Sequence, residues 1–360
     1  MNGPCAYNGH FRHGIKRAMI ARTPIVLQPR FTEDWQQLLA DGFSNCDELF
    51  NSLAIPAARR PALATQDNRF PLRVPRGFVA RMRKGDPDDP LLRQILPLHE
   101  EDTPVAGFGF DPVGDRAALT GAGLLQKYHG RALLITTGAC AIHCRYCFRR
   151  HFPYQQQHAR QNNWHDVISA LKQDVSINEV ILSGGDPLLL TTTHLQSLTS
   201  QLSELPHIRR LRIHTRIPVV LPERINAGLI KWLSELPLQP VVVIHANHPA
   251  EIDTNVSRHL AALRSPSLTL LNQSVLLRGI NDDCDILASL SERLFETGVM
   301  PYYLHQLDRV HGAAHYQVAE EAALALHRQL RQRLPGYLVP QLVYEEAGAP
   351  SKQPLPRYQD

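Results

Sequence analysis

The chain has 360 residues, and its 38 lysine and arginine residues against 34 aspartate and glutamate residues give a formal net charge of +4. That length suffices for one large α/β unit with an N-terminal extension, and so weak a charge gives no support to nucleic-acid binding. The sequence has no run of 18 apolar residues, which excludes a transmembrane helix. Six cysteines, three of them in one short loop, suit a reducing compartment better than a disulfide framework, so we expect a soluble cytoplasmic protein.

The first third of the chain has an irregular pattern. Residues 1–18 are basic but lack the apolar core of a signal peptide. We expect them to form a disordered tail, and the alternative is that translation starts at Met19, which opens the first apolar stretch. A helix is predicted to begin after Thr32, a suitable N-cap, and a second helix is predicted from Val74 to Met82. We interpret residues 19–120 as a mostly helical N-terminal extension.

From residue 131, short β-branched runs alternate with helical segments. The runs begin near residues 132, 180, 211, 241, 268 and 299, and the helical segments cover 164–173, 195–205, 223–236, 256–264, 286–297 and 319–334. This alternation predicts parallel strands joined by right-handed crossovers. Six pairs are too few for a closed eight-stranded barrel, so the predicted fold is α/β, a partial (β/α)6 TIM-like barrel over residues 121–335 with a C-terminal segment at 336–360.

The loop after the first predicted strand carries Cys140, Cys144 and Cys147 in a C-x3-C-x2-C arrangement. Three thiolates can hold three irons of a [4Fe-4S] cluster and leave the fourth iron open to a small molecule, which indicates chemistry rather than electron storage. A zinc site usually takes four protein ligands from paired C-x2-C units, and His143 lies inside the same loop. The spacing alone favours a cluster, with a zinc site or ordinary thiols as the alternatives.

Other polar motifs also follow predicted strands, and active sites of β/α barrels gather at the carboxyl ends of strands. These motifs are Gly184-Gly185-Asp186-Pro187, His214-Thr-Arg216, His245-Ala-Asn-His248, Asn272-Gln273 and Asp308. Taken alone, the Gly-Gly-Asp-Pro motif reads as a strand-to-helix turn. Its two glycines also allow the backbone to approach a ligand closely, so a binding role is the second interpretation.

Three segments resemble the radical S-adenosylmethionine superfamily and, within it, the lysine 2,3-aminomutase family. They are Cys144-Arg-Tyr-Cys-Phe-Arg-Arg-His-Phe, Leu182-Ser-Gly-Gly-Asp-Pro187 and Leu271-Asn-Gln-Ser-Val-Leu-Leu-Arg-Gly-Ile-Asn281, in the order that the family shows. The resemblance is strongest to the branch that makes (R)-β-lysine for attachment to elongation factor P. It implies a partial barrel and an isomerase that converts L-α-lysine to (R)-β-lysine by 2,3-amino migration.

The resemblance also implies cofactors and the residues that bind them. The three cysteines would hold the [4Fe-4S] cluster, and the Gly-Gly-Asp-Pro motif would bind the amino group of S-adenosylmethionine, which chelates the open iron. Lys352 would be the catalytic lysine that binds pyridoxal 5'-phosphate covalently, and Lys127 and Arg131 would meet the phosphate of this cofactor. Each of these three side chains could instead be a solvated surface cation.

For the substrate, the resemblance assigns Arg149 to the carboxylate of lysine, because a guanidinium can bind a carboxylate in a bidentate manner. Asp308 and Glu345 would bind the distal ammonium group. The family usually has aspartate where this chain has Glu345, and the longer side chain changes the geometry there. Both acids could instead be surface charges.

The free-lysine branch of the family continues past its pyridoxal lysine into a cysteine-bearing zinc segment. This sequence has no cysteine beyond Cys284, so we expect no structural zinc and interpret Cys5, Cys46 and Cys284 as ordinary thiols. The expected partners are L-lysine, a reductant such as a flavodoxin or ferredoxin, and a ligase that acts on elongation factor P, with no nucleic acid and no membrane. The alternatives are a free-lysine aminomutase of metabolism, a pyridoxal-independent radical S-adenosylmethionine enzyme and a non-catalytic iron–sulfur electron carrier.

Overall fold

The computed structural model describes residues 34–65, 70–121, 123–154 and 164–355. All of these residues belong to one compact unit that spans residues 33–360. The predicted tail at residues 1–18 and the predicted N-cap Thr32 lie outside the described residues. No helix within the described ranges is long and apolar enough to cross a membrane.

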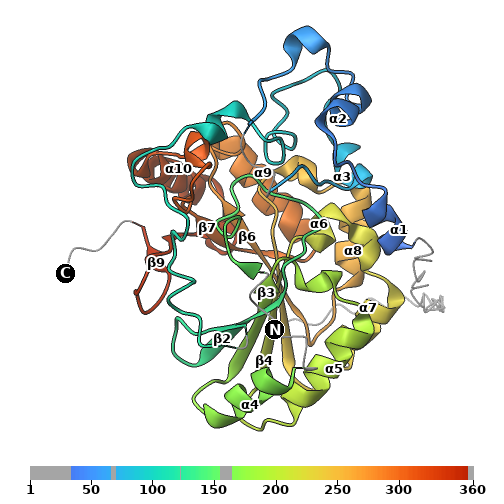
Figure 1. The fold of residues 1–360 in the computed structure, drawn as a ribbon, viewed down its shortest axis with the longest axis vertical. Helices are drawn as coiled ribbons and strands as arrows, with labels where there is room; N and C mark the ends of the chain where they lie inside the picture. The colour runs from blue at the N-terminus through green and yellow to red at the C-terminus, as the bar shows by residue number, and fades with distance from the viewer. Residues whose placement is uncertain (1–33, 66–69, 122, 155–163, 356–360) are drawn as a thin grey trace, which may run out of the picture. The chain divides into compact units, whose positions relative to one another are not determined.

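The described part of the chain forms a nine-stranded sheet whose strands follow one another in chain order (Figure 1). The inner strands pair in parallel, and they are β2 (Arg131–Thr137), β3 (Glu179–Gly184), β4 (Arg210–Thr215), β5 (Gln239–Ile244), β6 (Thr269–Val275), β7 (Met300–His305) and β8 (Gln341–Tyr344). The edge strands β1 (Leu124–Leu125) and β9 (Gln353–Pro354) pair in an antiparallel manner. This mostly parallel, barrel-like sheet confirms the predicted fold class.

Helices connect consecutive parallel strands and lie outside the sheet (Figure 1). They are α4 (His165–Gln173), α5 (Thr192–Ser203), α7 (Ala227–Ser234), α8 (Thr254–Ala262), α9 (Cys284–Glu296) and α10 (Glu320–Arg333), with the one-turn helix α6 (Ile217–Val220) directly after β4. In α9, Leu287, Leu290 and Leu294 recur every three or four residues and are buried, as expected for one apolar stripe of a helix. All six predicted crossover helices are therefore confirmed.

One parallel strand was not predicted from the sequence. Strand β8 follows α10 and pairs with β7, with Leu342 opposite Leu304. It has only four residues and comes directly after Pro340, so its apolar run is too short to give a strong strand signal. The C-terminal segment therefore contributes a seventh parallel strand to the described sheet.

The described part of the predicted N-terminal extension contains three short helices, α1 (Trp35–Ala40), α2 (Cys46–Ser52) and α3 (Arg76–Val79), between irregular segments. The N-cap of α1 is Asp34, whose side chain accepts a hydrogen bond from the Gln36 amide, so the predicted cap at Thr32 was wrong. Apolar residues of this region, among them Phe50 and Phe78, are buried in the same core as the inner strands. The extension is thus packed against the barrel.

Candidate active site

A cavity of about 340 Å³ opens among the carboxyl ends of the inner strands, and every site residue predicted from the sequence lines it. These residues are Lys127, Arg131, Cys140, Cys144, Cys147, Arg149, Gly184, Gly185, Asp186, Asp308, Glu345 and Lys352. The first and last of them lie more than 200 positions apart in the sequence, and the barrel brings them together. The strand-end pattern had predicted this for the cysteines, the Gly-Gly-Asp motif and Asp308, whereas the resemblance alone had indicated the others.

The glycines of the Gly-Gly-Asp-Pro motif pack against the start of the cysteine loop. The Gly185 amide donates a hydrogen bond to the Thr137 carbonyl, and the Asp186 amide donates one to the Ala139 carbonyl. A Cβ atom at position 185 would lie 2.1 Å from the Ala139 carbonyl oxygen, a separation that no side chain tolerates. Glycine is therefore required here by packing as well as by any ligand.

The carboxylate of Asp186 is occupied by the protein itself. It accepts hydrogen bonds from the Thr215 hydroxyl at 2.7 Å and from the Arg216 and Ile217 amides at 2.7 and 3.1 Å. Burial raises the pKa of Asp186 in spite of these donors. The side chain thus ties β3 to the turn after β4, and the Gly184 carbonyl accepts a hydrogen bond from the Tyr154 hydroxyl at 2.7 Å.

The three cysteines form a donor set that suits an iron–sulfur cluster. All three are free, half-buried thiols that line the cavity. Burial, together with repulsion between the sulfur atoms, raises the pKa of Cys147 to about 11 and that of Cys140 well above its usual range. Three thiolates that line one cavity and repel one another need a compensating positive charge, which the irons of a cluster would supply.

A chain of acidic and basic groups also lines the cavity. Lys352 Nζ lies 2.5 Å from Glu345 Oε2, and Lys127 Nζ lies 2.8 Å from Glu345 Oε1. Lys127 Nζ also lies 2.6 Å from Asp115 Oδ1, while Arg149 Nε donates to Asp115 Oδ2 at 2.6 Å. The chain of contacts from Lys352 to Arg149 therefore joins the predicted cofactor lysine to the predicted carboxylate-binding arginine.

The two predicted ammonium-binding acids differ in their ionisation. Although burial opposes its charge, the ammonium groups of Lys352 and Lys127 hold the pKa of Glu345 far below its usual range. Burial, reinforced by the neighbouring Glu345 carboxylate, raises the pKa of Asp308 to about 7. Asp308 is thus an acid whose negative charge lacks full compensation, as a site for a cationic ligand requires.

The two predicted phosphate-binding residues have different surroundings. Lys127 donates to the Val113 carbonyl at 2.8 Å in addition to its two acidic partners. The Arg131 guanidinium, at the start of β2, lies 5.3 Å from the ring centre of Tyr128. Lys352 itself is a half-buried primary amine inside the cavity, which fits an aldehyde cofactor.

Several cavity residues were not predicted. Asp115 lies in the irregular N-terminal region, where no periodicity marks it. His214, His245 and His305 follow or end strands, and burial lowers the pKa of each, so these rings are neutral at pH 7. His214 and His245 belong to strand-end motifs of the sequence analysis, but nothing in the sequence showed that these two histidines and His305 line one cavity.

Comparison with known proteins agrees with this geometry. Residues 134–264 match the family model described as the radical SAM superfamily. The chain is 46% identical over 332 residues to the L-lysine 2,3-aminomutase of Escherichia coli (strain K12), which covers 92% of this chain and 97% of that protein. It is 40% identical over 334 residues to the L-lysine 2,3-aminomutase of Haemophilus influenzae (93% and 98%) and 30% identical over 328 residues to that of Clostridium subterminale (90% and 78%).

Proposed function

We propose that this chain isomerises L-α-lysine to (R)-β-lysine. It belongs to the lysine 2,3-aminomutase family of radical S-adenosylmethionine enzymes. As a family member it is an isomerase that uses a [4Fe-4S] cluster, S-adenosylmethionine and pyridoxal 5'-phosphate. When bound, the cluster and S-adenosylmethionine supply radical chemistry, and pyridoxal phosphate supplies the π-system across which an amino group can migrate.

The observation that carries the proposal is that one cavity combines the three cysteines with Lys352 and the two acids Asp308 and Glu345. The cysteines fit the cluster, Lys352 fits pyridoxal phosphate, and the acids fit a second ammonium group. The ionised form of a half-buried acid with a pKa of about 7 is stabilised when a cation lies beside it, and the side-chain ammonium of lysine is such a cation. An amino acid without a distal amine would leave Asp308 uncompensated.

We assign the carboxylate of the substrate to Arg149. Its Nε donates to Asp115 at 2.6 Å and its Nη1 donates to the Ser183 hydroxyl at 2.9 Å, so the guanidinium has a fixed orientation at the cavity wall. A fixed guanidinium loses little conformational entropy when a carboxylate binds. Arg149 and the acid pair would then hold opposite ends of lysine and orient its C2 and C3 atoms.

In the cofactor-free protein Glu345 is held by two cations, because the Nζ atoms of Lys352 and Lys127 lie 2.5 and 2.8 Å from its two carboxylate oxygens. We propose that Glu345 acts on the substrate ammonium together with Asp308, while Lys127 continues to compensate part of its charge. Glutamate is one methylene longer than the aspartate usual in the family.

We further propose that the β-lysine is attached to elongation factor P by a partner ligase, and that a flavodoxin or ferredoxin supplies the electron. The support is the resemblance of the motifs to the β-lysylation branch.

The isomerase proposal is tested by anaerobic incubation of cluster-loaded protein with lysine, S-adenosylmethionine, pyridoxal phosphate and dithionite. Chromatography should detect β-lysine, and omission of any one component should abolish its formation. If S-adenosylmethionine were cleaved but lysine remained unchanged, the lysine assignment would be wrong.

The role in elongation factor P modification needs a separate experiment. Deletion of the gene should remove the β-lysyl group from elongation factor P, as shown by the mass of the intact protein, and added β-lysine should restore it. An unchanged mass in the deletion strain would favour a metabolic free-lysine enzyme instead.

A further inference from the structure

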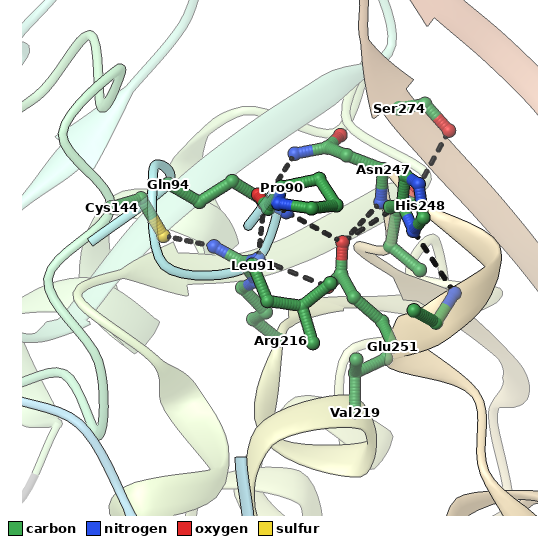
Figure 2. Close-up of polar contacts among 12 residues, drawn as sticks. Pro90, Leu91, Gln94, Cys144, Arg216, Val219, Asn247, His248, Glu251 and Ser274 are labelled. Carbon is green, nitrogen blue, oxygen red and sulfur yellow. Dashed lines mark hydrogen bonds and ion pairs between the residues drawn. The ribbon is translucent and has the colours of Figure 1, made fainter. Parts of the chain in front are cut away.

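A buried polar cluster contacts Cys144 through Arg216 (Figure 2). We name it the Arg216 network, and its members are Gln94, Tyr146, Arg216, Asn247 and Glu251. All five side chains are buried, and Gln94, Asn247 and Glu251 are completely enclosed. Polar groups so far from water must satisfy one another, so their arrangement is specific.

Arg216 connects this network to one of the predicted cluster ligands. Its Nη1 donates to Cys144 Sγ at 2.6 Å, and its Nη2 donates to Gln94 Oε1 at 2.6 Å and to Glu251 Oε2 at 3.0 Å (Figure 2). The guanidinium also lies 5.5 Å from the ring centre of Phe78. Arg216 is therefore held in place from several sides while it points one N–H group at a cysteine sulfur.

Glu251 holds the other end of this arrangement. Its Oε1 accepts hydrogen bonds from the Gln94 amide group at 3.1 Å and from the backbone amides of Asn247 and His248 at 2.9 and 3.0 Å. These contacts fix the carboxylate, and Arg216 is its cationic partner. The pair is close to neutral overall, so Arg216 donates to the sulfur without adding a full positive charge to the loop.

We propose that Arg216 and Glu251 form a positioning pair that sets the reduction potential of the cluster through Cys144. The inference rests on the proposed attachment of the cluster to the three cysteines. Hydrogen bonds to cluster sulfurs and the net charge nearby are the main means by which a protein tunes such a potential. The N–H donor of Arg216 stabilises the extra negative charge of the reduced cluster and raises the potential, while Glu251 limits this rise.

The experiment is a potentiometric titration of the cluster in the holoenzyme without S-adenosylmethionine, followed by electron paramagnetic resonance. Two variants should shift the potential in opposite directions. R216M/E251Q removes one positive and one negative charge, so the net charge is unchanged while the donor to Cys144 is lost. At the wild-type midpoint, we expect its ratio of reduced to oxidised cluster to fall at least tenfold, or about 59 mV for a one-electron couple.

The single variant E251Q keeps the donor and removes the compensating negative charge. The same ratio should therefore rise at least tenfold at the wild-type midpoint. R216K keeps the positive charge beside Glu251 but lacks the planar guanidinium that contacts Cys144, Gln94 and Glu251 together. This variant should lower the ratio of reduced to oxidised cluster. Unchanged midpoints in R216M/E251Q and R216K, or a shift of the same sign in R216M/E251Q and E251Q, would overturn the inference.

The matched control is E179Q. Glu179 is also a buried partner of an arginine, with Arg212 Nη2 at 2.7 Å, but it begins β3, roughly 16 Å along the strand from Gly184 at about 3.3 Å per residue. This variant should leave the midpoint unchanged, and a shift equal to that of E251Q would contradict a local effect. Iron and sulfide analysis separates this inference from the proposed function. A wild-type protein that binds no cluster would refute the proposed cluster site. A full cluster whose potential is the same in wild type and variants would refute only the role of Arg216 and Glu251.

Discussion

Lys352 Nζ lies 2.5 Å from Glu345 Oε2 across the hairpin formed by β8 and β9. In that hairpin Tyr344 pairs with Gln353. The next two residues toward the turn, Glu345 and Lys352, therefore also face each other. The turn between them contains Gly348 at φ +83°, a conformation that glycine adopts without strain. The register of a short antiparallel pair therefore places the lysine inside the cavity.

This placement predicts where pyridoxal phosphate binds. Borohydride reduction of the loaded protein, followed by peptide mass mapping, should find the adduct on Lys352, and Lys352→Ala should abolish both the adduct and β-lysine formation. Lys172 in α4 is the control, since Lys172→Ala should retain both. An adduct on Lys127, the other lysine of the cavity, would show that the cofactor assignment is wrong.

The cysteine loop gives a second prediction. Replacement of Cys140, Cys144 or Cys147 by alanine should remove iron and abolish S-adenosylmethionine cleavage, because each thiolate would hold one iron. Cys284, at the start of α9, is a half-buried free thiol outside the cavity lining, and Cys284→Ala should retain iron and activity. Full iron content and activity in Cys144→Ala would contradict the proposed cluster site.

Substrate selection depends on Asp308 in the proposed function. Asp308→Asn should lower kcat/KM for lysine on the order of 100-fold, because a buried ammonium that loses its charged partner is strongly disfavoured. Glu345→Gln should act in the same direction, and S-adenosylmethionine binding should survive both changes. Normal turnover of lysine by Asp308→Asn would show that the ammonium is held elsewhere.

The raised pKa of Asp308 also predicts a pH-dependent stability of the cofactor-free protein. Aspartate in an unfolded chain has a pKa near 3.9, whereas Asp308 in the folded protein titrates at about 7. Between these values the folded protein keeps a proton that the unfolded chain has lost. This group therefore makes the free energy of unfolding fall as the pH rises from about 4 to about 7.

Asparagine cannot ionise, so Asp308→Asn should lack this loss of stability. Relative to wild type, it should gain about 1 kcal/mol, or about 2 °C in Tm, between pH 5 and pH 8, a modest value because water partly screens a half-buried charge. Thermal unfolding of both proteins at the two pH values measures this difference. Identical pH dependence in wild type and variant would show that Asp308 is not perturbed.

The fold could be predicted wherever the chain gives a long and consistent signal. Strand β3 contains Val180, Ile181 and Leu182, all buried, and its β-branched run predicted it directly. Strand β8 was missed because four residues after a proline carry little periodicity, and the small residues around Lys352 give no strand signal. In the structure, β9 directly after Lys352 pairs with β8 and so fixes the position of this segment, and that pairing exists only in the folded sheet.

The candidate site divides in the same way. Residues next to a recognisable motif or strand end, such as Cys144, Gly184 and Asp308, could be predicted from the sequence. Gln94 and Asp115 could not, because both lie in irregular N-terminal segments whose position depends on packing against the barrel. Neither residue has local periodicity or spacing that relates it to Cys144 or Arg149.

Asp115 is the unpredicted residue with the clearest consequence for the proposed substrate site. It is almost fully buried, with Arg149 on one carboxylate oxygen and Lys127 near the other, both at 2.6 Å. These two cations hold the pKa of Asp115 below its usual range although burial opposes its charge. Asp115 therefore orients Arg149 without itself reaching the substrate in the proposed arrangement.

Asp115→Asn should consequently weaken lysine binding through Arg149. Charged hydrogen bonds contribute about 1.5–3 kcal/mol, so kcat/KM for lysine should fall about 10- to 100-fold, mainly through KM. Inhibition by 1,5-diaminopentane, which has both amines of lysine but no carboxylate, should be unchanged. Asp111→Asn is the control, because Asp111 accepts hydrogen bonds from the Asp115 and Arg116 amides but does not contact Arg149. An equal loss of affinity for lysine and diaminopentane in Asp115→Asn would mean that Asp115 supports the cavity as a whole and does not position the carboxylate-binding arginine.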